Sequence, residues 1–139
     1  MIDIESLIPH RDPIKIMTEV IEIKGDNGIA AAVVNERWPL CDGRAVQSIV
    51  LIEAIAQTAA IVEGYKRKKS GKDGVKGWLV GIKSAEFTRD SIPLSTRITV
   101  SVNRLYSFEK YGVTEGVVKA GDEILLTAVL QVMRLNEDV

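Results

Sequence analysis

Alternation of apolar and polar side chains is the most frequent pattern along the chain. Two such stretches, residues 14–24 and 28–35, are separated by a short glycine-containing turn. Four more follow at residues 75–89, 97–110, 111–120 and 123–135. Successive side chains of a strand point to opposite faces, so alternation with a period of two is typical of a strand with one buried face. Because turns of hairpin length join most of these stretches, the pattern predicts an antiparallel sheet.

A different pattern occupies the middle of the chain. Residues 44–69 are predicted to form one long helix that is apolar on nearly every side and ends in the cationic turn of residues 66–69. Strands on both sides of a single helix indicate an α+β fold, in which an antiparallel sheet covers one face of the helix. The far face also needs a cover. A second copy of the chain is the simplest one, so we expect a homodimer.

Composition narrows the class of protein. The 139 residues carry a net charge of −1 with acids and bases mixed along the chain, which argues against nucleic-acid binding. Cys41 is the sole cysteine, so we expect no disulfide within the chain and no cysteine-cluster metal site, and a cytoplasmic location fits best. Residues 45–62 approach the length of a membrane span, but their polar side chains favour a core helix. We expect one domain over residues 1–139, with no secretory signal and no membrane partner.

Glu53 is the exception within the apolar helix. Ile49, Ile52 and several alanines surround it in the sequence, and an unpartnered carboxylate among such residues is costly. Gln57 lies one helical turn further on the same face, where its amide reaches the carboxylate. A carboxylate held in this way suits a general acid or base. The alternative is a purely structural ion pair across a dimer interface.

Three further features carry weaker signals. His10 is the sole histidine and lies in a proline-flanked loop, where a surface role is the ordinary interpretation. The backbone N–H groups near Ser48, at the start of the helix, are suited to holding a carbonyl oxygen or an anion, although most helix starts bind nothing. The cations of residues 66–72 form either a solvated helix end or a docking surface for an acidic protein.

Four segments resemble the beta-hydroxyacyl-(acyl carrier protein) dehydratases of the FabZ type. LIPHRDPIKIMTEV resembles their N-terminal motif, and VLIEAIAQTAAI, with its Glu-x-x-x-Gln pair, resembles the start of their central helix. WLVGIKSAEFTRDSIP and RITVSV resemble the two strands that follow. The similarity therefore covers most of the chain in the same order.

The resemblance implies a hotdog fold, in which an antiparallel sheet wraps around one long helix and two subunits form a continuous sheet. It also implies dehydration of a 3-hydroxyacyl thioester in fatty-acid or polyketide-type acyl metabolism. In the family a loop histidine removes the proton beside the thioester. The helix glutamate, which corresponds to Glu53, protonates the departing hydroxyl across the dimer interface. This acid–base chemistry implies no cofactor and no metal.

The chain departs from the family at the loop before the helix. The family histidine lies fourteen positions before the glutamate, in a His-Phe-Pro-Gly run, and this position is Pro39 here. The Pro-Gly pair at the start of the family helix is replaced by Gln47 and Ser48. The usual catalytic pair is therefore incomplete, and the oxyanion-binding turn is altered.

Three interpretations remain open. In a divergent dehydratase, His10 or a partner subunit supplies the missing base. In a thioesterase, Glu53 alone activates water or attacks the thioester. In a non-catalytic acyl-binding subunit, the chain pairs with an active homologue in a heteromeric dehydratase. We favour the first, because LIPH matches the family where the loop does not and because a pure scaffold has little need of both Glu53 and Gln57.

The substrate that the resemblance implies is an acyl thioester on acyl carrier protein or coenzyme A. An apolar tunnel beside the helix is expected to hold the acyl chain, lined by Ile49, Ile52 and residues 79–82, where Gly81 allows a close approach. Gln57 and Ser48 are the polar candidates for contacting the substrate. The cations of residues 66–69 would suit an acidic carrier protein. Assembly into a hexamer, or into a heteromer with a homologous subunit, is left open.

Overall fold

The structure is a computed structural model that describes residues 2–8, 15–71 and 76–135, and the side chains of residues 79–133 within the last range. In these ranges the chain forms one short 3-10 helix, one α-helix and eight strands. Their order is η1 (Ile4–Ser6), β1 (Glu19–Lys24), β2 (Asn27–Val33), β3 (Ala45–Gln47), α1 (Val50–Lys69), β4 (Lys76–Phe87), β5 (Ser91–Pro93), β6 (Arg97–Phe108), β7 (Tyr111–Ala120) and β8 (Glu123–Leu135).

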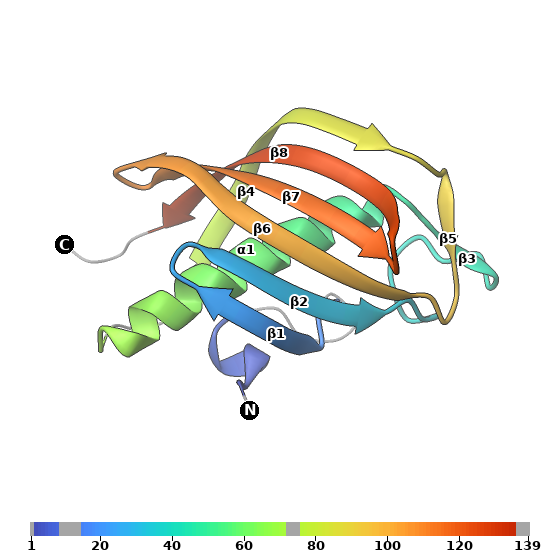
Figure 1. Ribbon diagram of the computed structural model, residues 1–139, viewed down its shortest axis with the longest axis horizontal. Helices are drawn as coiled ribbons and strands as arrows, with labels where there is room; N and C mark the ends of the chain where they lie inside the picture. Colours follow the sequence, from blue (N-terminus) through green and yellow to red (C-terminus); the bar gives the residue numbers. More distant parts are fainter. Residues whose placement is uncertain (1, 9–14, 72–75, 136–139) are drawn as a thin grey trace.

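Six of the strands form one antiparallel sheet in the order β1-β2-β6-β7-β8-β4, and this sheet curves around α1 (Figure 1). Tight turns join β1 to β2, β6 to β7 and β7 to β8. Gly25 and Gly121 have positive φ in two of these turns, which glycine adopts without strain. The remaining strands, β3 and β5, pair in a small sheet beside the N-terminal end of α1. This is the α+β architecture that the sequence predicts.

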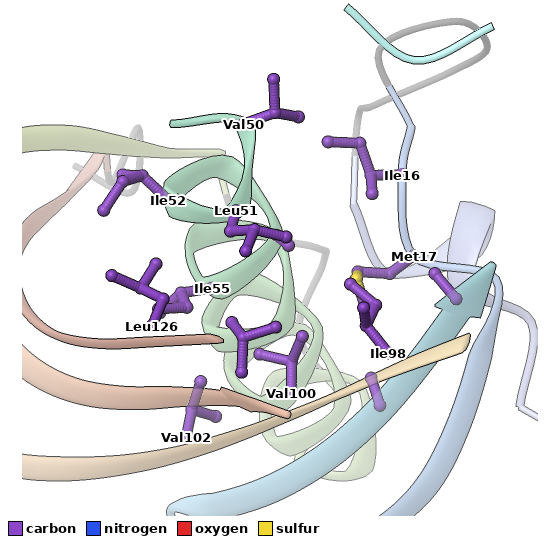
Figure 2. Packing of buried hydrophobic residues seen from close by; sticks show 14 of the residues in the cluster. Ile16, Met17, Val50, Leu51, Ile52, Ile55, Ile98, Val100, Val102 and Leu126 are labelled. Carbon is purple, nitrogen blue, oxygen red and sulfur yellow. The ribbon is translucent and has the colours of Figure 1, made fainter. Parts of the chain in front are cut away.

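Helix α1 packs closely against the sheet because strand glycines leave room for its side chains. A Cβ atom on Gly116 of β7 would overlap Ile55, and a Cβ atom on Gly28 of β2 would overlap Val62. Ile55 is fully buried in the core between helix and sheet, and Figure 2 shows it on the same side of the helix as Leu126 of β8. The hydrophobic side of the helix is therefore buried by the sheet at near-contact distance.

The N-terminal segment covers a second side of α1. Leu7, Ile16 and Met17 are buried in the same core as the helix, and Figure 2 shows Ile16 and Met17 across the helix from Leu126. A Cβ atom on Gly64 would lie 2.6 Å from the carbonyl oxygen of Leu7. The N-terminal segment of the chain thus covers part of the helix surface that we expected a second copy of the chain to cover. The homodimer stays a prediction.

The helix begins later than predicted, at Val50 rather than at Arg44. Residues Ala45–Gln47 form β3 instead, because they pair with β5, which lies on the far side of the helix in sequence. The side chain of Asp42 also accepts hydrogen bonds from the N–H groups of Arg44 and Ala45, at 2.8 and 2.9 Å, which fixes a turn where the helix was expected. Local apolar patterning indicates burial but does not show such long-range pairing.

The first strand is also shorter than predicted. It begins at Glu19, and residue 14 of the predicted strand lies outside the described residues. Residues 15–18 are not in a strand, because the N–H groups of Ile16 and Met17 bond to a helix side chain rather than to a neighbouring strand. The later strands are confirmed: β7 and β8 have the predicted bounds, and β4 and β6 lie within theirs. No helix in the described ranges is long and apolar enough to cross a membrane.

Candidate functional site

Glu53 and Gln57 are joined as their spacing predicts. Both lie on α1, and the Gln57 Nε2 donates a hydrogen bond to the Glu53 Oε1 at 3.1 Å. Gln57 is fully buried, whereas Glu53 is half-buried. The amide therefore orients the carboxylate from the inside, while Glu53 also reaches the space beside the helix.

The other end of the Gln57 amide holds the N-terminal segment. Its Oε1 accepts hydrogen bonds from the backbone N–H groups of Ile16, at 2.8 Å, and of Met17, at 3.3 Å. An amide has both donors and an acceptor, so one side chain can connect a carboxylate to backbone N–H groups. Gln57 is thus a positioning residue that fixes Glu53 relative to the segment that leads into β1.

A cavity of about 390 Å³ opens beside Glu53, between α1 and the inner face of the sheet. Its volume lies in the range of sites that hold small molecules, about 300 to 1,000 Å³. The helix contributes a strip of small and acidic side chains to the wall, namely Glu53, Ala56, Ala59, Ala60 and Glu63, together with Lys66. The sheet contributes Leu79 from β4, Arg104 from β6, Thr114 from β7, and Val132 and Met133 from β8. Residues 107 and 109–112 of the β6–β7 hairpin complete it.

A group of charged side chains lies at the end of this cavity away from Glu53. Arg104 pairs with Glu63 of α1, and its Nη1 lies 3.6 Å from the Oδ1 of Asp26 in the β1–β2 turn. Lys66 also pairs with Asp26. The hydrogen bond from Lys66 holds the pKa of Asp26 below its usual value, and the charge of Arg104 acts in the same direction. These four residues, which we call the charged cluster, tie the helix to two parts of the sheet.

The loop before the helix contains no histidine. Pro39, at the position that corresponds to the family histidine, is exposed. Asp42 holds the following turn, and its hydrogen bonds from Arg44 and Ala45 lower its pKa. Ser48 is buried, with 3% of its surface exposed, and its Oγ has no hydrogen-bond partner among the described residues. Its N–H donates to the carbonyl of Asp90 at 2.9 Å.

The predicted site residues are only partly brought together. Glu53 and Gln57 meet, and Ser48 lies five residues before Glu53, just ahead of the helix. Ile49 is 49% exposed, and it and Gly81 are not among the residues that line the cavity. The side chain of Gln131 fills the space next to Gly81. His10 lies outside the described residues.

The predicted docking cations are partly engaged within the chain. Lys66 pairs with Asp26, and the Nζ of Lys68 donates to the Oγ of Ser6 at 3.1 Å. Lys69 stands over the ring of Tyr65, with its Nζ 5.3 Å from the ring centroid. These contacts favour the interpretation of a helix end that is packed onto its own chain over one kept free for a partner.

Sequence reasoning missed Glu63 and Arg104, although both carry a signal. On β6, the inward-facing residues Ile98, Val100 and Val102 are buried. Every second residue of a strand faces the same side, so Arg104 is the next residue on the inner face. Glu63 follows Ala59 and Ala60 by four and three residues, so it falls on the same strip of the helix as these two cavity-lining alanines. Arg104 thus continues the buried face of β6, and Glu63 continues the strip of α1 that faces it. An ion pair between two such oppositely charged residues can be predicted.

Comparison with known proteins connects this chain to one family. A family model described as ApeP dehydratase, of the ApeP-like group, matches residues 2–139. The 3-hydroxyacyl-(acyl-carrier-protein) dehydratase FabZ of Alkaliphilus metalliredigens is 27% identical over 142 residues, which cover 97% of this chain and 93% of that protein. The FabZ of Rhizobium etli is 36% identical over 101 residues, 67% of this chain and 62% of that protein.

Solved structures share the fold at low sequence identity. A chain of the dehydratase heterocomplex ApeI:P from Xenorhabdus doucetiae has a TM-score of 0.89 at 20% identity, with 99% of this chain and 93% of that chain covered. A hypothetical thioesterase from Streptococcus pneumoniae, solved with coenzyme A, has a TM-score of 0.66 at 10% identity, with 85% of each chain covered. The hotdog fold is therefore confirmed, as is the FabZ-like character of the sequence. The chain belongs to the ApeP-like dehydratase family.

Proposed function

We propose that this protein dehydrates a 3-hydroxyacyl thioester, with Glu53 as the general acid. A base removes a proton from C2, next to the thioester carbonyl. The C3–O bond then breaks, Glu53 protonates the leaving hydroxyl so that it departs as water, and a C2=C3 double bond forms. The observation that carries this proposal is the position of Glu53, which is held by the buried Gln57 amide and faces a cavity of acyl-chain size.

His10 is the base that we propose for the same chain. It is the sole histidine of the sequence, and imidazole is the side chain best suited to accept a proton near neutral pH. The first described residue after it is Lys15, one residue before the Ile16 N–H that bonds to Gln57. Gln57 in turn bonds to Glu53, so two hydrogen bonds connect the segment before β1 to the proposed acid.

The acyl group is proposed to arrive on a phosphopantetheine arm, carried by acyl carrier protein or by coenzyme A. The relatives named FabZ act on the carrier-protein form, as their name states. In this chain Lys68 and Lys69 contact Ser6 and Tyr65 but are still exposed, and their positive charge is compatible with an acidic carrier protein.

The test is an assay of the purified protein with a 3-hydroxyacyl thioester, in which conjugated alkene and free thiol are measured in parallel. We expect alkene without thiol, and a loss of about a hundredfold or more in kcat for Glu53→Gln and for His10→Asn. Glu22→Gln, at an exposed position of β1, is the matched control and is expected to keep full activity. Thiol release without alkene would establish a thioesterase instead, and equal rates for Glu53→Gln and wild type would exclude both enzymatic interpretations.

A second candidate function is that of a subunit in a heteromeric dehydratase. Pro39 in place of the loop histidine favours it, because a homologous partner that keeps this histidine would complete the pair across an interface. The ApeI:P structure is described as a dehydratase heterocomplex, which is compatible with such an arrangement. Dehydration by the chain alone, lost in His10→Asn, would contradict this second candidate. Dehydration that appears only when a homologous subunit is added would support it.

A further inference from the structure

The end of the β6–β7 hairpin exposes a group of large apolar side chains. Phe108 is 71% exposed, more than any other large apolar side chain that the structure describes, and Tyr106 and Leu105 are 50% and 48% exposed. Leu105 is the extra residue where the register between β6 and β7 shifts. These three residues, which we call the apolar tip, lie within four positions of one another. Exposed apolar side chains gathered in this way mark a surface that another body covers.

The neighbouring strands extend this apolar surface. Tyr111 of β7 is the register partner of Phe108, and Met133 of β8 is the register partner of Tyr111. Directly paired residues share a face of the sheet. Met133 is 41% exposed, and the ring centroids of Tyr106 and Tyr111 are 6.4 Å apart. The apolar surface therefore crosses three strands at this end of the sheet.

Exposed lysines lie at the same end of the molecule. Figure 1 shows the β6–β7 hairpin and the C-terminal end of α1 at one end of the molecule, and Lys66 of α1 lines the same cavity as Lys110 of the hairpin. Lys68, Lys69 and Lys110 are exposed, and they outnumber Glu109, the acid of the hairpin turn. The acids of the charged cluster are already paired with its own cations. This end of the molecule therefore attracts an anionic surface.

A lipid surface fits this combination better than a folded protein does. A stable protein interface buries about 800 Å² on each partner and takes in roughly 20 to 30 residues a side. The apolar tip is only the end of one hairpin. Aromatic rings beside lysines are typical of proteins that lie in the interfacial region of a bilayer. The expectation of no membrane partner concerned spanning segments, and a peripheral contact needs none.

We propose that the protein binds peripherally and reversibly to bilayers that contain anionic phospholipids. The apolar tip enters the interfacial region, while Lys68, Lys69 and Lys110 contact the lipid phosphates. Residues 109–112 of the hairpin line the cavity, so this contact turns the hairpin side of the cavity toward the bilayer. The proposed dehydration plays no part in the contact, and each of the two can therefore fail without the other.

Vesicle flotation measures the contact directly. The wild type is mixed with vesicles of equal parts phosphatidylcholine and phosphatidylglycerol, and separately with vesicles of phosphatidylcholine alone. We expect partition onto the anionic vesicles to exceed partition onto the neutral vesicles about tenfold, and to fall as salt is added. Equal partition onto both kinds of vesicle overturns the proposal, as does a wild type that binds neither.

Substitutions at exposed positions attribute the binding to the apolar tip. Tyr106→Ser combined with Phe108→Ser removes two exposed rings and leaves the buried core intact, so the fold is expected to survive. Its partition onto anionic vesicles should fall about tenfold. Ile124→Ser is the matched control, because Ile124 is 43% exposed and lies beside the β7–β8 turn at the other end of β7. This control should bind like the wild type, and so should Phe108→Trp, which keeps an aromatic ring.

The lysines are tested in the same assay. Lys68→Gln combined with Lys110→Gln should lower partition onto anionic vesicles, whereas Lys119→Gln, at an exposed position near the other end of β7, should not. Unchanged partition of the double serine variant overturns the role of the apolar tip. A wild type that ignores vesicles, and that loses self-association when the two serines are introduced, would assign the apolar tip to a second copy of the chain and overturn the lipid contact.

Discussion

Gln57 explains how a carboxylate is kept in an otherwise apolar helix. Its buried amide donates to Glu53 and accepts from the N–H groups of Ile16 and Met17, so both ends of the amide are hydrogen-bonded. The spacing of four residues was sufficient to predict the contact between Glu53 and Gln57. The contact with the N-terminal segment spans about forty residues of sequence, and no local pattern indicates it.

At this scale we predict that Gln57→Met lowers the free energy of unfolding by about 3 kcal/mol, because it leaves two buried backbone N–H groups without an acceptor. Chemical denaturation of the variant and the wild type measures the difference. Gln47→Met, at an exposed glutamine just before the helix, is the matched control and should change the stability by less than about 0.5 kcal/mol. A Gln57→Met protein as stable as the control would show that the network does not hold the N-terminal segment.

At the scale of elements, close contact between helix and sheet depends on particular glycines. Gly116 faces Ile55 with no space for a side chain. A Cβ atom on Gly112, four residues earlier on β7, would have its nearest neighbour in Val132, at an ordinary contact distance of 3.5 Å. The alternation of the sequence predicted β7 with its correct bounds, but it did not distinguish these two glycines. Their difference arises only when the helix is placed on the sheet.

We therefore expect Gly116→Ala to destabilise the protein by about 1 to 3 kcal/mol, since the helix must move away from β7. Gly112→Ala should be neutral or slightly stabilising. Thermal or denaturant unfolding compares the two. In an Ile55→Ala background, where the space is enlarged, Gly116→Ala should cost less, and a cost that remains the same would exclude contact with Ile55 as its origin.

The charged cluster links elements through Asp26. Its pKa is lowered in the folded protein, chiefly by the hydrogen bond from Lys66. Such a group stabilises the fold fully above its unfolded pKa of about 3.9, and this contribution is lost as the pH falls through the lower folded pKa. We expect the stability difference between wild type and Asp26→Asn to be constant near neutral pH and to shrink below about pH 4. Unfolding measured from pH 7 to pH 2.5 tests this, and a difference that grows toward acid pH would contradict the pairing.

The start of the helix shows the limit of element prediction. Residues 45–62 form one apolar run, and most of this run is buried as predicted, although Gln47 and Ile49 are exposed. Its first part nevertheless became β3, because the partner strand β5 lies more than forty residues further along the chain. The end of the helix was predicted correctly at Lys69, where the cationic turn and Gly71 are local signals.

At the scale of the whole molecule, one edge of the sheet indicates where a partner would bind. Strand β4 is an edge strand, and Ile82 is 48% exposed although its register partner on β8, Leu130, is fully buried. Paired residues share a face of the sheet, so the inner face is uncovered along this edge. An unpaired apolar edge is usually covered in the native assembly. This position supports the predicted dimer from a feature independent of the helix.

We expect the wild type to be a dimer, and Ile82→Lys to be a monomer, in sedimentation or light-scattering measurements. Ile21→Lys changes a residue of nearly equal exposure, 47%, on the strand at the opposite edge, and should leave the dimer intact. A monomeric wild type would contradict the predicted dimer. An Ile82→Lys variant that forms a dimer of unchanged stability would show that the interface does not include the β4 edge.

The fold class, the six strands of the large sheet and the Glu53–Gln57 contact were thus accessible from sequence, because each depends on local periodicity or on a contiguous motif. The polar far end of the cavity was not recognised, because Arg104 and Glu63 meet only when β6 lies over the helix. The most direct test of Glu53 as the acid is the rate of C2=C3 formation by folded Glu53→Gln relative to wild type on one 3-hydroxyacyl thioester. A fall of about a hundredfold or more is predicted, and equal rates would contradict the proposed reaction.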